Sequence, residues 1–232
     1  MKKLLSIALA LCLTLTATAA LAAGKLNVVQ EDFHVVGTSY VYGHAYAKVE
    51  NSGDKPIKIN SGVLEIYDGD GNPITSVDYM NAYARYLAPG EYTYVRMSSD
   101  IAEGQAANVS DYMMTLAGKS DNSTYDLRLP VETAISLGEG DKWYTRNYIY
   151  ATVTNNTENP LYSISVVLAV LDAEGKIVYI DDDSLYSDRA LMPGSSMIIR
   201  KDISTSFMDY FAANNIVPTT VDAIAYVEIE KE

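Results

Sequence analysis

The chain has 232 residues, of which 48% are hydrophobic, and it carries 17 basic and 30 acidic side chains. This hydrophobic content is enough to bury a core and excludes global disorder. The acidic balance argues against nucleic acid and against an anionic membrane as partners, because binding to phosphate groups requires clustered Lys and Arg.

The N-terminus has the three parts of an export signal. Lys2-Lys3 is a positive n-region, residues 4–15 are an apolar h-region, and Ala20-Leu21-Ala22 is an A-x-A cleavage site. We expect a signal peptide over residues 1–22, cleavage before Ala23, and a secreted or extracytoplasmic protein that is not held in a membrane. The apolar run is shorter than the ~20 residues that a spanning helix requires.

Cleavage at this site also removes the only cysteine, Cys12. The remaining 210 residues carry 15 basic and 30 acidic side chains, a net charge of −15, and no thiol. This composition excludes a disulfide scaffold, a thiolate metal site and a cysteine nucleophile in the exported protein.

The first predicted strand covers residues 41–49. Small or aliphatic side chains alternate there with Tyr42, His44, Tyr46 and Lys48, and this period of two is typical of a strand with one apolar face.

The next predicted strand, residues 57–67, ends at the turn Asp68-Gly69-Asp70-Gly71, where a glycine supplies the positive φ of a tight hairpin. A Pro-Gly corner at residues 87–90 precedes a returning strand at 92–97. Short strands with such regular turn signals indicate an antiparallel β-sandwich.

The same pattern recurs 104 residues later. Between Tyr46 and Arg96, 16 of 51 positions are identical to those 104 residues further on. We therefore predict an all-β protein of two tandem sandwiches over residues 23–117 and 125–232, joined by a linker over residues 118–124.

The second copy is also expected to contain one short helix. Ser206 is the expected N-cap, Phe207, Tyr210 and Phe211 share an apolar stripe, and Asn214-Asn215 favours a stop. In the strand over residues 161–171 we assign Leu168 to the inner face and Ala169 to the outer face. Leu168→Asp should then unfold the copy, whereas Ala169→Asp should be tolerated.

These turn and core residues resemble the FxLYD domain family. The matching residues are Val49-x-Asn51, Leu64-x-Ile66-Tyr67-Asp68, Gly71 and Leu87-Ala88-Pro89-Gly90, with their counterparts 104 residues later. The second copy departs from the family in having Leu171 in place of the tyrosine, and both copies have an aliphatic residue in place of the leading phenylalanine. The resemblance implies small immunoglobulin-like sandwiches of exported bacterial proteins, and it implies no catalytic residue.

Candidates for catalysis or metal binding are few. His34 and His44 are the only histidines, and a zinc site or an imidazole-based triad needs further partners. The segment Asp68–Asn72 resembles the start of a calcium loop, but Pro73 stands where the loop needs glycine, so a hairpin is favoured. Asp181-Asp182-Asp183 is either a cation site or a solvated acidic rim. We predict no catalytic residue, no metal site and no cofactor.

Tyrosine is the unusual residue, with 19 copies against three Phe and one Trp. Tyr42 and Tyr46 lie on the polar face of their strand, and with Tyr67 they form the candidate binding surface, because exposed tyrosine suits contacts with sugars and proteins. The alternative is that these rings pack against neighbouring strands or the other copy.

The sequence therefore predicts an exported, non-catalytic binding or adhesion-type module of the bacterial cell envelope or extracellular space. Its expected partner is a protein or polysaccharide of the envelope or of a host surface. The alternatives are a structural spacer or subunit without its own ligand and, less favoured, a secreted hydrolase, which would need two converging carboxylates in a cleft.

Overall fold

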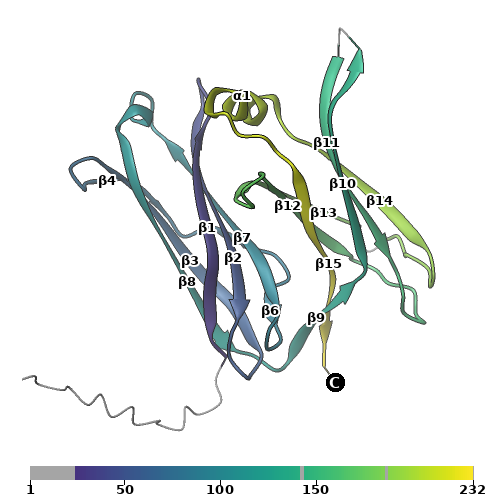
Figure 1. Cartoon of the computed structure of the whole chain (residues 1–232). Coiled ribbons are helices and arrows are strands. Elements are labelled where there is room, and N and C mark those ends of the chain that lie inside the picture. Colours follow the sequence, from purple (N-terminus) through teal and green to yellow (C-terminus); the bar gives the residue numbers. More distant parts are fainter. Residues whose placement is uncertain (1–23, 142–143, 186–187, 232) are drawn as a thin grey trace, which may run out of the picture.

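The computed structural model describes residues 24–141, 144–185 and 188–231, so the predicted signal peptide lies outside the described residues (Figure 1). The fold is all-β, as predicted. Two antiparallel sandwiches, called here the first copy and the second copy, follow one another along the chain.

The first copy contains eight described strands in two sheets. They are β1 (Leu26–Val36), β2 (Val41–Asn51), β3 (Ile57–Asp68), β4 (Pro73–Val77), β5 (Met80–Ala82), β6 (Tyr86–Leu87), β7 (Tyr92–Ile101) and β8 (Val109–Ser120). The inner sheet of the first copy has the order β1-β2-β7-β5. In its outer sheet β4 and β6 pair with different ends of one edge of β3, and β8 pairs with the opposite edge of β3. A short 3-10 turn over Ala106–Asn108 precedes β8.

The second copy adds seven described strands and a helix. They are β9 (Thr124–Leu129), β10 (Val131–Asp141), β11 (Tyr144–Thr154), β12 (Ser165–Leu171), β13 (Ile177–Ser184), β14 (Ser196–Asp202), α1 (Thr205–Asn214) and β15 (Thr220–Glu230). The inner sheet of the second copy has the order β13-β12-β15-β9, and its outer sheet has the order β10-β11-β14.

Strand registers confirm the 104-residue repeat. In the first copy β2 pairs with β7 so that Tyr46 faces Arg96, and in the second copy Tyr150 faces Arg200 at the equivalent pair of β11 and β14. Likewise Leu64 faces Val77 and Leu168 faces Asp181. Each pair of partners is displaced by the same 104 residues, so the two copies share one pairing scheme.

A buried asparagine explains one of the repeated identities. The Asn51 side chain is fully buried, and its amide donates hydrogen bonds to the carbonyls of Lys55 and Leu87 at 2.8 and 2.9 Å. Asn155 donates the equivalent bonds to Asn159 and Leu191, both at 2.8 Å. The asparagine therefore ties the strand end to the Pro-Gly corner in both copies.

The repeated aspartate has an equivalent structural role. Asp68 Oδ1 accepts hydrogen bonds from the amides of Asp70 and Asn72 at 3.0 and 2.8 Å, and Asp172 accepts the matching bonds from Glu174 and Lys176. These bonds close a hairpin turn, which is the alternative that the sequence favoured over a calcium loop.

Two predicted boundaries need correction. Pairing of β8 with β3 continues to Ser120, and β9 begins at Thr124, so the connection covers only residues 121–123 rather than 118–124. The helix begins at Thr205 with Ser204 as its N-cap residue, so Ser206 is not the cap. It ends at the left-handed Asn215, as the Asn-Asn pair suggested. Among the described helices, none is long and apolar enough to span a bilayer.

Three apolar clusters show that the four sheets are stacked. One core lies between the two sheets of the first copy and another between the two sheets of the second copy. The third cluster joins the two inner sheets across the copies (Figure 1). It contains Tyr46, Tyr83, Ala84 and Tyr94 from the first copy and Val167, Ala169, Ile177, Ile180 and Ile224 from the second.

This third cluster overturns the predicted tolerance of Ala169→Asp. Val167 and Ala169 do face away from the core of the second copy, but both are completely buried against the first copy. The strand β12 is therefore buried on both faces. The face that points away from the core of the second copy contacts the first copy and is not a solvated surface.

A buried carboxylate lies at the same interface. Asp126 of β9 is 5% exposed, and its Oδ2 accepts a hydrogen bond from the Tyr86 amide of the other copy at 2.7 Å. Its Oδ1 has no partner among the described residues. Burial raises the pKa of this carboxyl to about 6. The Tyr86 amide and Arg128 oppose the rise, while Glu228 and Glu91 add to it.

The raised pKa predicts a pH dependence of stability. Between about pH 4 and pH 6 the folded chain binds more protons at Asp126 than the unfolded chain, so this carboxyl makes stability fall as pH rises through that window. Asp126→Asn keeps an acceptor for Tyr86 without the charge. Its melting temperature relative to the native protein should therefore increase from pH 4 to pH 7. A difference that stays constant over this range would contradict the assignment.

Candidate functional site

The structure separates the three tyrosines of the predicted binding surface. Tyr42 is 39% exposed, but Tyr46 is 1% exposed and lies in the cluster between the copies. Tyr67 lies on β3, in the other sheet of the sandwich, so it cannot adjoin Tyr42. The predicted surface is therefore wrong as a unit: Tyr42 lines two cavities and Tyr46 lines one of them, whereas Tyr67 lines neither.

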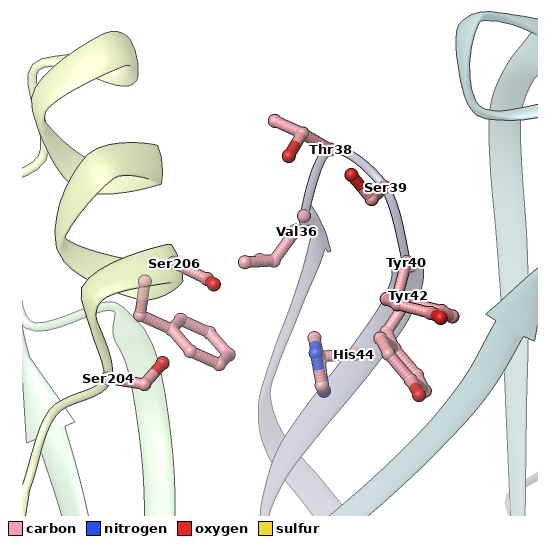
Figure 2. Close-up of a pocket in the computed structure, with 10 residues that line it drawn as sticks. Val36, Thr38, Ser39, Tyr40, Tyr42, His44, Ser204 and Ser206 are labelled. Atoms are coloured by element: carbon pink, nitrogen blue, oxygen red, sulfur yellow. The ribbon is translucent and has the colours of Figure 1, made fainter.

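That cavity opens where the β1–β2 turn approaches the start of α1. It has a volume of about 410 Å³. Figure 2 shows Thr38, Ser39, Tyr40 and Tyr42 on one wall, Ser204 and Ser206 on the opposite wall, and His44 between them. The two walls come from different copies, so the cavity depends on how the copies pack.

Gly37 fixes the turn that forms one wall. Its φ is +113°, a conformation that favours glycine, and a β-carbon there would collide with the Tyr40 carbonyl oxygen. Val36, immediately before it, is buried in the core cluster of the second copy. The wall is therefore held in place by contacts with both copies.

A second cavity of about 340 Å³ adjoins the first. Both cavities are lined by Tyr42, His44 and Phe207. The second cavity is further lined by Tyr46, Tyr79, Asn81, Arg96, Ser98, Tyr179 and Ile180. We call the two together the inter-copy groove.

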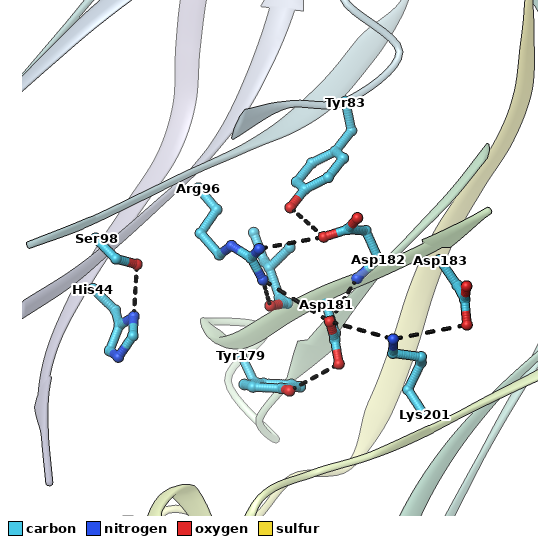
Figure 3. Close-up of polar contacts among 10 residues, drawn as sticks. His44, Tyr83, Arg96, Ser98, Tyr179, Asp181, Asp182, Asp183 and Lys201 are labelled. Carbon is cyan, nitrogen blue, oxygen red and sulfur yellow. Dashed lines mark hydrogen bonds and ion pairs between the residues drawn. The ribbon is translucent and has the colours of Figure 1, made fainter. Parts of the chain in front are cut away.

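Arg96 connects this groove to a charged cluster between the copies (Figure 3). Its guanidinium donates hydrogen bonds to the Ile180 carbonyl at 3.0 Å and to Asp182 Oδ1 at 3.3 Å. The Tyr83 hydroxyl donates to the same Asp182 oxygen at 2.7 Å. Arg96, the only cation among the described residues that line the groove, is therefore already paired with a carboxylate.

The three adjacent aspartates are also paired. Lys201 Nζ lies 3.7 Å from an oxygen of Asp183 and 4.0 Å from one of Asp181. The Arg96 guanidinium lies 3.3 Å from Asp182 Oδ1 and 3.9 Å from Asp181 Oδ1, so Arg96 contacts two of the three aspartates (Figure 3). Among the described residues, no group of three or more His, Cys, Asp or Glu is arranged to hold a metal ion.

The two histidines face each other across β1 and β2, and both rings contact Tyr46. Burial lowers the pKa of His44 to about 4, helped by the nearby charge of Arg96, so the ring is neutral at pH 7. His44 Nδ1 lies 2.8 Å from Ser98 Oγ. In the described part of the chain no carboxylate is hydrogen-bonded to His44, so a complete Ser-His-Asp arrangement is not formed there. His34 lies 2.8 Å from the Ile177 carbonyl and bridges the copies.

Sequence reasoning missed most residues of the groove. Thr38, Ser39, Ser204 and Ser206 lie in a turn and at a helix start, where Ser and Thr are common for local reasons. They come together only through packing of the two copies. The unbroken apolar run over residues 166–171 was the one available signal, since it is typical of a strand buried on both faces.

Comparison with known proteins adds little. The sequence matches no protein-family model, and no curated protein is significantly similar to it. Among solved structures, the chain is similar to the crystal structure of red sea bream transglutaminase, with 10% identity and a TM-score of 0.23. The match covers 77% of this chain and 27% of that one. A similarity this weak carries no argument about function.

Proposed function

We propose that this chain is an exported, non-catalytic binding module of the bacterial cell envelope or extracellular space, made of two FxLYD-like copies. Its ligand, a protein or polysaccharide of the envelope or of a host surface, is held in the inter-copy groove. The observation that carries this proposal is the groove itself, which is lined by side chains of both copies and leaves the Tyr42 ring accessible.

The chemistry of the groove favours binding over catalysis. The described residues that line its two cavities include no Asp or Glu, whereas hydrolysis of glycosides normally uses a pair of carboxylates. Aromatic rings and hydroxyl groups are instead typical of recognition surfaces. The predicted signal peptide supports export.

A structural spacer is the second candidate. It is favoured by the role of Tyr46, Tyr83 and Tyr94, which are buried between the copies and therefore hold the protein together. If the protein is a spacer, its many tyrosines contribute to the stability of the fold and not to binding.

Binding by matched tyrosine variants distinguishes the two candidates. The exported chain, Tyr42→Ala and Tyr67→Ala are applied to a glycan array and to immobilised envelope proteins. Tyr42→Ala should weaken binding of the main ligand at least tenfold, because a central aromatic anchor contributes about 2 kcal/mol or more. Tyr67→Ala should bind like the native chain, since Tyr67 lies in the outer sheet. Equal binding by all three proteins would favour the spacer.

A further inference from the structure

We propose that the inter-copy groove binds an uncharged oligosaccharide, with one sugar ring stacked on Tyr42 in the cavity between the β1–β2 turn and α1. This proposal rests on the proposed binding function and specifies the class of ligand. It follows from the side chains that line the first cavity, from their charge, and from the adjacent position of the second cavity.

In the part of the chain that the structure describes, no formally charged residue lines the first cavity. None of the ten residues that line it is Asp, Glu, Lys or Arg, although the predicted exported chain carries 15 basic and 30 acidic side chains. The imidazole ring of His44, which faces the cavity from β2, is neutral at pH 7 because burial lowers its pKa. A ligand in this cavity therefore meets no counter-charge, which favours an uncharged molecule.

Hydroxyl groups occupy opposite walls of this cavity. Thr38 and Ser39 lie on the first copy, and Ser204 and Ser206 lie on the second copy (Figure 2). A serine or threonine hydroxyl both donates and accepts hydrogen bonds, as does a sugar hydroxyl. The lining therefore matches a ligand that carries many hydroxyl groups around its rim.

Aromatic rings supply the complementary apolar surface. Tyr40 is 83% exposed and Tyr42 is 39% exposed. The Tyr42 ring lies 5.9 Å from the His44 ring, and His44 lies 5.0 Å from Phe207. A pyranose ring has an apolar face of C–H groups, and such a face packs on an aromatic ring while its hydroxyls reach polar neighbours.

The size of the groove favours more than one sugar unit. Its cavities measure about 410 and 340 Å³, and each lies within the range of about 300–1,000 Å³ that is typical of small-molecule sites. They share Tyr42, His44 and Phe207, so the two cavities adjoin each other. In the second cavity Asn81 and Ser98 add polar groups, and Arg96 is already paired with Asp182.

Calorimetric titration tests this class of ligand. The probes are four neutral hexasaccharides, built from glucose in α- and β-linkage, mannose and N-acetylglucosamine, together with an oligogalacturonate, a sulfated heparin hexamer and oligolysine. At least one neutral probe should bind. Tyr42→Ala should lower its affinity at least tenfold, whereas Tyr42→Phe, which keeps the ring, should stay within about threefold of the native protein.

A matched control and the charged probes make the test decisive. Tyr125→Ala removes a tyrosine that is 41% exposed on β9 and lines neither cavity, so it should leave the affinity unchanged. If a charged probe binds in a Tyr42-dependent manner and no neutral one does, the proposed ligand class is wrong while the binding function stands. If no probe and no envelope protein binds in a Tyr42-dependent manner, both proposals fail.

Discussion

Ala169→Asp is expected to lower the free energy of unfolding by about 3–5 kcal/mol, the loss found when an uncompensated charge is buried. Ala169 is completely buried in the cluster that joins the two inner sheets, together with Tyr46 and Tyr94. A carboxylate introduced there would lie between the apolar strand β12 and tyrosine rings of the first copy. It must therefore either remain charged without a partner or force the copies apart.

Urea denaturation of three variants measures this effect. Ala134→Asp is the matched control, because Ala134 is exposed on β10, and it should change stability by no more than about 0.5 kcal/mol. Leu168→Asp, which points into the core of the second copy, should be at least as destabilising as Ala169→Asp. If Ala169→Asp behaved like Ala134→Asp, the outer face of β12 would be solvated and the stacked arrangement would be wrong.

Asn51→Ala and Asn155→Ala should each destabilise the protein by about 3 kcal/mol or more, because each buried group left without a hydrogen bond costs about 1–3 kcal/mol. Both side chains are completely buried. Removing the Asn51 amide leaves the Lys55 and Leu87 carbonyls without this donor, and removing the Asn155 amide does the same at Asn159 and Leu191. The two losses should be similar, since the bonds are equivalent.

Exposed asparagines provide the controls for this pair. Asn60 and Asn156 are exposed, and their alanine variants should stay within about 0.5 kcal/mol of the native protein. A large effect at Asn51 with a negligible one at Asn155 would show that the two copies do not depend on the same structural element.

The sequence was sufficient to predict the parts of the fold that depend on local pattern. The alternation over residues 41–49 places Ala45, Ala47 and Val49 in the core, as observed. The aligned Asn51 and Asn155 have the same bonds because turn closure is a local requirement. The residues that are identical in the two copies therefore predicted the secondary structure and its register correctly.

The contact between the two copies could not be predicted from the sequence pattern. A period of two shows that Tyr46 and Ala169 each point away from the core of their own copy. It does not show what covers these outward faces. Here each outward face covers the other, so two predicted surface positions are buried. The groove was missed for the same reason, since Thr38 and Ser206 are distant in sequence and meet only after the copies pack.

Differential scanning calorimetry of the exported chain tests most directly the claim that the two copies form one body around the groove. The cluster between the inner sheets buries residues of both copies, so unfolding either copy exposes the face of the other. The account predicts a single transition whose calorimetric and van't Hoff enthalpies agree, as for one cooperative unit. Two separable transitions, each with half of the enthalpy, would contradict it.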